Sequence, residues 1–216
     1  MNWLGELVVE PAAFAQAYKS PPAPRVLVAT PNREIRGSTA ICKMDVAFVE
    51  GPGACDYHWK QVPVPGELKR DPDKDKSSGV DLARYVREAF VAQDSRRFVL
   101  GFTLCGSLLR QWEFDRLGAI ASIPVNIQED GRHLVSVILG FLWMNDKELG
   151  FDPTITTEGK QRYITINQKG ETEQLIVDKS MTRSGCIAGR ATTCWKAYLE
   201  RDSGREHLYV VKDSWQ

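Results

Sequence analysis

The sequence predicts an α+β fold, with a mixed sheet and flanking helices followed by antiparallel hairpins. Residues 1 to about 150 show patterns in the order helix, strand, strand, helix, strand, which is typical of a sheet covered by helices. Residues from about 155 onward show strand patterns joined by short polar turns, with no helix pattern to cover them. We therefore expect two units, at residues 1–152 and 153–216.

Composition and charge narrow the classes of protein. Of the 216 residues, 43% are hydrophobic and 26% are charged, which is the usual balance of a globular protein. Lys+Arg and Asp+Glu both number 28, which argues against a broadly basic nucleic-acid binder but permits a local basic cleft. No apolar run is long enough for a transmembrane helix, so we expect no membrane partner. The five cysteines form no C-x-x-C pair and indicate reduced thiols in an intracellular protein, in the cytoplasm or nucleus.

Apolar spacing predicts the elements of the first unit. Helices are expected over about residues 3–18 and over residues 80–93, where Val80, Val86 and Phe90 recur at helical spacing. Strands are expected within residues 38–51 and 57–69, and two more around Cys105–Gly106. The charged stretch "RDPDKDKSSG" reads as a solvated loop. The apolar stretch "HLVSVILGFLWM" fits either a buried strand or a helix, and its periodicity does not decide between them.

The second unit reads as two hairpins. One turns at Lys169–Gly170 and the other at Asp202–Gly204. The closing stretch "HLYVVKDSWQ" is expected to be a buried strand with Lys212 on its apolar face. A lysine in that position is costly unless an anionic partner meets it. Unpaired strand edges in these hairpins make self-association an expected property.

Two carboxylates and a lysine lie at neighbouring strand ends of the predicted first unit. Asp45 lies in one strand, and Glu67 and Lys69 lie at the end of the next, with a helix following. Residues two apart on a strand share a face, so Lys69 could orient a water beside Glu67. Two carboxylates on neighbouring strands can hold Mg²⁺, which polarises a phosphate and lowers the pKa of a bound water. The alternative is a solvated ion pair at a strand end.

This arrangement, centred on residues 41–115, resembles the Asp…Glu-x-Lys site of the restriction-endonuclease-like, PD-(D/E)XK, fold. The resemblance implies a Mg²⁺-dependent nuclease or a nucleic-acid-binding module that uses Asp45, Glu67 and Lys69, with Asp45 and Glu67 as the metal ligands. Gln93 fits the position of a supporting polar residue in such folds. Glu-x-Lys alone is a weak signal, because Glu158-Gly159-Lys160 repeats it in a predicted turn.

The second unit shows the order strand, small-residue loop, strand, turn, strand with a lysine. Gly185 and Gly189 lie in the loop, although the full G-x-G-x-x-G pattern of protein kinases is absent. The alternative is an ordinary hairpin whose lysine reaches solvent at a sheet edge. Asp115 and Arg116, within "WEFDRLG", are expected to form a structural ion pair rather than a catalytic acid–base pair.

Six strings from about Cys42 to Gln216 resemble the fungal-type protein kinase domain family. They are "VPGELK", "AQDSRRFVLGFTL", "WEFDRLG", "ELGFDPTI", "GRATTCWKAY" and "YVVKDSWQ". The resemblance implies that residues 153–216 form the opening strands of a kinase N-lobe. It also implies that Lys212 contacts the phosphates of ATP, under a loop that includes Gly189, Arg190, Thr192 and Thr193, with ATP and Mg²⁺ as the cofactors of the complete fold.

The chain departs from the kinase pattern in its missing motifs. It contains neither an H-R-D-x-x-x-x-N catalytic loop nor a D-F-G motif, and no helix supplies the glutamate that would pair with Lys212. We therefore expect the front part of a longer protein or a truncated paralogue, without kinase activity as it stands. A non-catalytic regulatory or interaction domain is the third interpretation.

Overall fold

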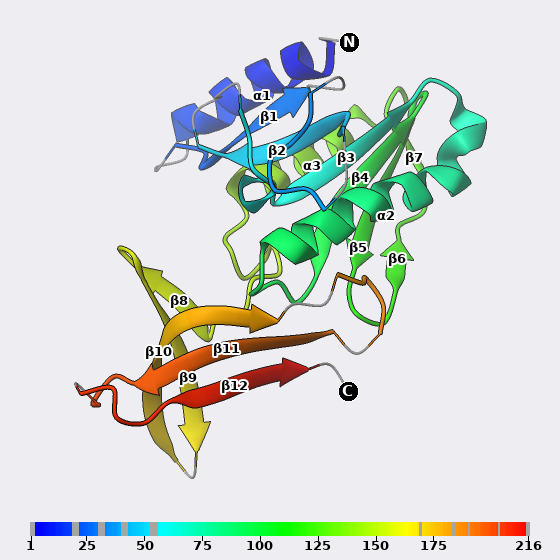
Figure 1. Ribbon diagram of the computed structural model, residues 1–216. Helices are drawn as coiled ribbons and strands as arrows, with labels where there is room; N and C mark the ends of the chain where they lie inside the picture. Colours follow the sequence, from blue (N-terminus) through cyan, green and yellow to red (C-terminus); the bar gives the residue numbers. More distant parts are fainter. Residues whose placement is uncertain are drawn as a thin grey trace.

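The computed structural model describes residues 3–18, 22–29, 33–39, 43–51, 56–168, 170–182, 185–189, 191–202 and 204–214, and these residues form two separate β-sheets (Figure 1). The first sheet is mixed and packs against helices, whereas the second is antiparallel. The predicted α+β class is therefore confirmed.

The first sheet is built by strands β1 to β7. Its order is β1-β2-β3-β4-β5-β6, and β7 pairs with β5. The pair β3 and β4 is parallel, and helix α2 makes the long crossover connection that a parallel pair requires. The strand bounds are Arg25–Ala29 (β1), Val46–Glu50 (β2), Val64–Lys69 (β3), Val99–Cys105 (β4), Leu108–Phe114 (β5), Ala119–Ala121 (β6) and Val125–Asn126 (β7).

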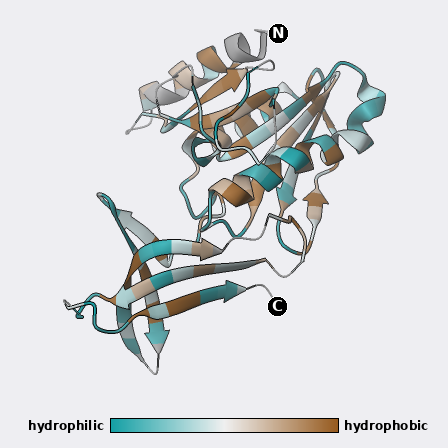
Figure 2. Cartoon of the chain, in the orientation of Figure 1, coloured by the Kyte–Doolittle hydropathy of each residue, from teal (hydrophilic) through white to brown (hydrophobic). Residues whose placement is uncertain are grey.

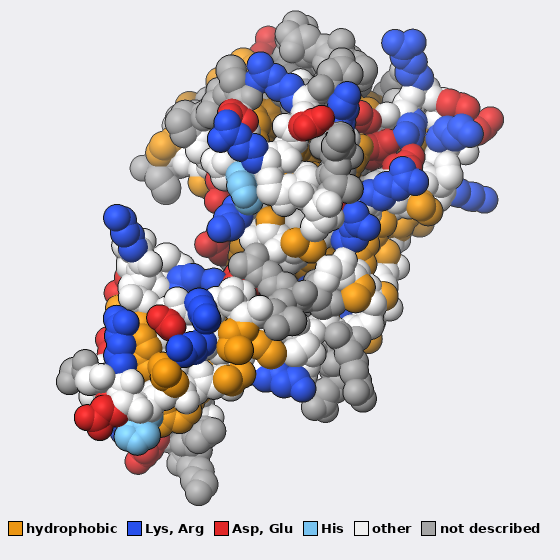
Figure 3. All heavy atoms as spheres, in the orientation of Figure 1, with side chains coloured by type: hydrophobic (Ala, Val, Ile, Leu, Met, Phe, Trp, Pro, Cys, Tyr) orange, Lys and Arg blue, Asp and Glu red, His pale blue; other side chains and the backbone are white. Residues whose placement is uncertain are grey.

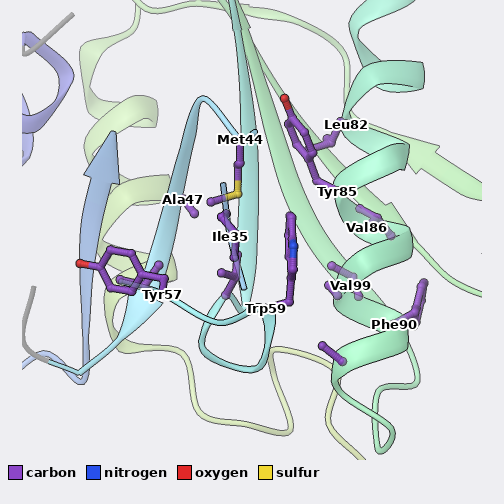
Figure 4. Close-up of a cluster of buried hydrophobic side chains, with 14 of the residues drawn as sticks. Ile35, Met44, Ala47, Tyr57, Trp59, Leu82, Tyr85, Val86, Phe90 and Val99 are labelled. Atoms are coloured by element: carbon purple, nitrogen blue, oxygen red, sulfur yellow. The ribbon is translucent and has the colours of Figure 1, made fainter. Parts of the chain in front are cut away.

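Helices cover both faces of this sheet. Helix α2 (Asp75–Ala92) packs on one face, and helices α1 (Trp3–Tyr18) and α3 (Gly131–Trp143) pack on the other. Side chains of β2 alternate between the two cores, since Ala47 faces α2 and Phe48 faces α3. Figure 4 shows the α2 core, in which Trp59 lies beside Tyr85 with ring centroids 6.3 Å apart. Hydrophobic residues are concentrated in this first sheet and on the helices over it (Figure 2).

Several local predictions needed correction. Helix α2 begins at Asp75, inside the stretch predicted as a solvated loop, because Asp75 is buried and paired with Arg110. Val80 is 65% exposed, and the α2 core takes Leu82 in its place, whereas Val86 and Phe90 are buried as predicted. Trp59–Gln61 form a short 3-10 helix, so the strand predicted over residues 57–69 begins only at Val64.

The ambiguous apolar stretch is helical. Helix α3 buries Leu134, Ile138, Phe141 and Leu142, which recur at helical spacing on the side that faces the sheet. The predicted helix over residues 3–18 and the two strands around Cys105–Gly106 are confirmed.

The second sheet is antiparallel, with the order β12-β11-β10-β9-β8. Its two predicted hairpins are confirmed: β9 pairs with β10 and β11 pairs with β12. Ile164, Leu175, Trp195 and Ala197 form its small core. The strand bounds are Ile155–Glu158 (β8), Gln161–Gln168 (β9), Glu171–Thr182 (β10), Thr192–Leu199 (β11) and Tyr209–Ser214 (β12).

The two sheets meet at the end of α2. Asp94, two residues beyond the helix, accepts hydrogen bonds from Arg162 Nη1 at 2.9 Å and from Trp195 Nε1 at 3.0 Å. Trp195 is only 1% exposed, so this carboxylate satisfies a buried donor of the second sheet. Asp94 therefore anchors the second sheet to the first.

Candidate functional sites

The structure brings Asp45, Glu67 and Lys69 together at one place in the first sheet. Asp45 lies immediately before β2, and its Oδ2 accepts a hydrogen bond of 3.1 Å from the backbone N–H of Leu68. Leu68 lies between Glu67 and Lys69 on β3, and β2 and β3 pair through Val46 and Gly66. The antiparallel register thus explains why these three side chains cluster.

Glu67 is the most constrained member of this cluster. It is 3% exposed, and its Oε1 lies 2.5 Å from Lys69 Nζ. Its Oε2 is buried and has no hydrogen-bond partner among the described residues. Burial raises the pKa of Glu67, and the nearby charge of Asp45 raises it further, although hydrogen bonds from Lys69 and Tyr85 oppose the shift. A buried carboxylate with an unoccupied oxygen is poised to accept a cation or a proton.

Helix α2 adds two side chains that the sequence analysis did not assign to the site. Asp81 lies 3.0 Å from Lys69 Nζ, so Lys69 bridges a strand carboxylate and a helix carboxylate. The hydrogen bond to Glu67, together with that to Asp81, raises the pKa of Lys69 and keeps it charged. Tyr85, one turn after Asp81, hydrogen-bonds to Glu67. Their i, i+4 spacing on a helix was the available signal.

Gln93 lies elsewhere, although it was predicted to support this cluster. Its Nε2 donates to the carbonyls of Trp59 and Val62, and its Oε1 accepts from Arg96 Nε at 2.6 Å. These hydrogen bonds hold the segment before β3 in place, so Gln93 stabilises the backbone that leads to the cluster.

The cluster has the donors for one hard divalent cation. Within the part of the chain that the structure describes, no three His, Cys, Asp or Glu side chains converge as a metal-ligand set. Mg²⁺, however, commonly keeps several waters and takes only one or two protein carboxylates. Such a cation would take Asp45 and Glu67, with the unpartnered Oε2, as its two protein carboxylates.

Lys212 lies on an exposed edge strand, which corrects the prediction of a buried closing strand. Strand β12 lies at the edge of the sheet and, among the described strands, pairs with β11 alone. Leu208, just before it, and its residues Tyr209 and Val210 are 53%, 42% and 64% exposed. Lys212 is exposed as well. The apolar alternation of this stretch predicted the strand correctly, but within the part of the chain that the structure describes no helix or second layer covers the face of β12 that carries Lys212.

The register places Lys212 at the loop end of the second sheet. Lys212 pairs with Cys194, two residues after β11 begins at Thr192. Cys194, Val210 and Lys212 therefore share one face, which we call the outer face.

The opposite face of these strands, which we call the inner face, carries Thr193, Trp195 and Asp213. Thr193 is 8% exposed and Trp195 reaches Asp94 on this side. Gly189 has φ +117°, a conformation that favours glycine. Arg190 lies outside the described residues. Of the predicted phosphate contacts, the structure thus places Lys212 on the outer face and Thr193 on the inner face.

Asp115 and Arg116 make separate contacts instead of the expected ion pair. Asp115 Oδ1 accepts from the backbone N–H groups of Leu117 and Gly118, which closes the β5–β6 turn. Arg116 is 6% exposed and donates to the carbonyl of Cys186 in the β10–β11 loop.

Comparison with known families identifies the class of this chain. A family model described as fungal protein kinase matches residues 43–216. The chain therefore belongs to the fungal protein kinase family. Comparisons with curated proteins and with solved structures give no match. Among the described residues, no helix is long and apolar enough to cross a membrane.

Proposed function

We propose that this chain is a nucleotide-binding member of the fungal protein kinase family, in which the outer face of β11 and β12 receives ATP. The observation that carries the proposal is the position of Lys212. It lies beside Cys194 at the loop end of the sheet, on the same exposed face as Val210.

The chemistry of this face suits a nucleotide. An ammonium group is a common phosphate ligand, and Lys212 forms no ion pair with any other described residue. Val210, 64% exposed, offers an apolar surface for a base on the same face. Mg²⁺ would accompany the phosphates, as it does in kinases.

Phosphoryl transfer needs groups that these 216 residues do not contain. Neither an H-R-D nor a D-F-G string occurs in the sequence, so no aspartate of those motifs is present to orient the nucleophile or hold the metal. We therefore expect Mg·ATP binding by this chain without transfer of phosphate to a protein substrate.

Calorimetric titration with Mg·ATP tests the proposal. Lys212→Ala should weaken binding by about tenfold or more, since a charge-assisted hydrogen bond contributes about 1.5–3 kcal/mol. Lys160→Ala, in the β8–β9 turn of the same sheet, serves as the matched control and should bind like the wild type. Absence of nucleotide binding, or equal loss in both variants, would refute the assignment of Lys212.

A second candidate function rests on the Asp45, Glu67 and Lys69 cluster. We infer that it cleaves or binds nucleic acid with the help of Mg²⁺, held by Asp45 and Glu67. When bound, that metal would polarise a scissile phosphate. Lys69, held by Glu67 and Asp81, would orient the attacking water and offset developing negative charge. Charges of both signs are interspersed on the face in Figure 3, so a nucleic acid would contact a local site rather than a broad basic surface.

Incubation with DNA and RNA in the presence of Mg²⁺ or Mn²⁺ tests this candidate. Asp45→Ala should abolish cleavage, whereas Glu158→Gln, in the second Glu-x-Lys sequence, should leave it intact. Cleavage that survives Asp45→Ala would exclude the cluster as the site. If neither nucleotide binding nor cleavage is found, a non-catalytic interaction or regulatory domain is the remaining interpretation.

A further inference from the structure

The β10–β11 loop is attached to the first sheet through its described residues 185–189. The backbone N–H of Gly189 donates a hydrogen bond of 2.9 Å to the carbonyl of Arg116, and Arg116 Nη1 donates to the carbonyl of Cys186. Arg116 belongs to the β5–β6 turn, more than 60 residues earlier in the chain. Arg116 therefore binds the loop through both its backbone carbonyl and its side chain.

Apolar contacts reinforce this attachment. Ile187 packs against the α2 core, which includes Phe90 and Phe114. The guanidinium of Arg116 lies 4.0 Å from the centroid of the Phe90 ring, a distance at which a cation and an aromatic face attract each other. The loop is thus held at Cys186, Ile187 and Gly189.

These contacts lie on the inner side of the second sheet. Trp195 and Asp213 face the first sheet from that side, because Trp195 bonds to Asp94 and the charge of Asp213 interacts with Arg116. Lys212 and Cys194 face the opposite way. A loop anchored on the inner side is held away from phosphates that lie against Lys212 on the outer face.

We propose that Arg116 and Ile187 restrain the β10–β11 loop on the inner side, and that ATP binding at Lys212 requires the loop to be released toward the outer face. This inference rests on the proposed nucleotide site and adds its regulation: the first sheet holds the loop in a position that opposes binding. Any partner or ligand that displaces the loop from Arg116 would then increase the affinity for nucleotide.

The contact between the β10–β11 loop and the first sheet has two features of a contact that can open. Arg116 Nε is buried without an acceptor among the described residues, which makes the attached state less favourable. Gly185, Cys186, Ala188 and Gly189 are exposed, so the loop loses little buried surface when it leaves. A site that is competent only part of the time binds with an affinity reduced by the competent fraction.

Two variants release the loop from opposite sides. Arg116→Ala removes the side-chain contact on the side of the first sheet. Ile187→Ser weakens the apolar contact on the side of the loop and leaves the first sheet unaltered. Each should bind Mg·ATP about tenfold more tightly than the wild type, if the loop is attached about nine-tenths of the time. Adding Lys212→Ala to either variant should abolish the gain. Arg132→Ala, at an exposed position of α3, is the matched control.

Hydrogen exchange provides a readout independent of nucleotide. Peptides that cover residues 183–191 should exchange faster in Arg116→Ala and Ile187→Ser than in the wild type and in Arg132→Ala. Equal or weaker nucleotide affinity in both released variants would overturn the inference while leaving the nucleotide site intact. Absence of binding in every protein, with faster loop exchange in the released variants, would instead overturn the proposed function and with it the coupling.

Discussion

Glu67 and Glu88 are both buried glutamates, and their surroundings shift their pKa values in opposite directions. Glu88 is 1% exposed; burial acts to raise its pKa, but hydrogen bonds from Thr39 and the adjacent Arg87 outweigh that effect and lower it. The backbone N–H and hydroxyl of Thr39 each lie 2.6 Å from its carboxylate. Burial raises the pKa of Glu67, and the nearby charge of Asp45 adds to that shift, whereas the hydrogen bonds that Glu67 accepts do not outweigh it. Glu88 therefore stabilises the fold as an anion, whereas Glu67 costs free energy when it is ionised.

These opposite shifts predict opposite responses to replacement by glutamine. Glu88→Gln should lower the free energy of unfolding by about 1–3 kcal/mol near neutral pH, because it weakens hydrogen bonds to a buried charge. The lowered pKa means that this contribution is present above the unfolded-state pKa of about 4.3 and is lost as the pH falls through the folded-state value. Glu67→Gln should leave stability unchanged or increase it at neutral pH. Its raised pKa means that the wild type loses stability as the pH rises above about 4.3.

Urea unfolding from about pH 2 to pH 8 measures both differences. The difference in free energy of unfolding between the wild type and Glu88→Gln should become smaller as the pH falls. As the pH rises, Glu67→Gln should become increasingly more stable than the wild type. A Glu67→Gln protein as unstable as Glu88→Gln would show that Glu67 is a structural ion pair, which would remove the reason to regard it as a functional group.

At the scale of the element, the close packing of helix α2 depends on a glycine that the spacing of its apolar residues did not reveal. Gly79 lies in the first turns of α2, and a Cβ there would fall 2.4 Å from the ring of Trp112 on β5. Trp112 is held by a hydrogen bond of 3.0 Å from its Nε1 to Thr103 Oγ1. The helix can therefore approach the sheet closely only where it has no side chain.

Alanine at two helical glycines should have opposite effects. Gly79→Ala should destabilise the protein, because overpacking costs about 1–3 kcal/mol against a gain of about 1 kcal/mol in helix propensity. Gly140→Ala in α3 should stabilise it by up to about 1 kcal/mol, since the nearest atom, Met144 Cε, would lie at 3.5 Å. Thermal unfolding of both variants tests the pair. A Gly79→Ala variant as stable as Gly140→Ala would contradict the close approach of α2 to Trp112.

At the scale of the whole molecule, Asp94 couples the two sheets. It accepts from Arg162 and from the buried Trp195, and both donors belong to the second sheet. The exposed apolar residues of β12 add a separate property, because an unprotected edge strand can pair with another chain. Self-association through this edge stays a prediction.

Asp94→Ala should loosen the second sheet selectively. It leaves Trp195 Nε1 buried without its carboxylate, at a cost of about 1–3 kcal/mol. Hydrogen exchange should rise in β9, β11 and β12 and stay unchanged in β3 and β4. Asp178→Ala, on β10 and 3.7 Å from Lys196, is the control that removes a more exposed carboxylate of the same sheet. Uniformly faster exchange in both sheets would show that they unfold as one cooperative unit.

The sequence by itself determined the helix over residues 3–18, the strands around Cys105–Gly106, the two hairpins, the Glu67-x-Lys69 spacing and the strings that carry the family resemblance. These follow from local rules, since side-chain period and turn residues act over a few positions. The sequence did not reveal the short strands β1, β6, β7 and β8. It could not decide whether residues 133–144 form a strand or a helix, because a short apolar run satisfies both periods.

Only the tertiary structure decided which distant residues meet. It brought Asp81 and Tyr85 to Glu67 and Lys69, left the outer face of Lys212 uncovered, and attached the β10–β11 loop to Arg116. Each of these depends on packing between segments far apart in the chain, where burial and hydrogen-bond geometry set the outcome and local periodicity carries no information. The lysine proposed to bind phosphate was therefore visible in the sequence, whereas the contact proposed to regulate it was not.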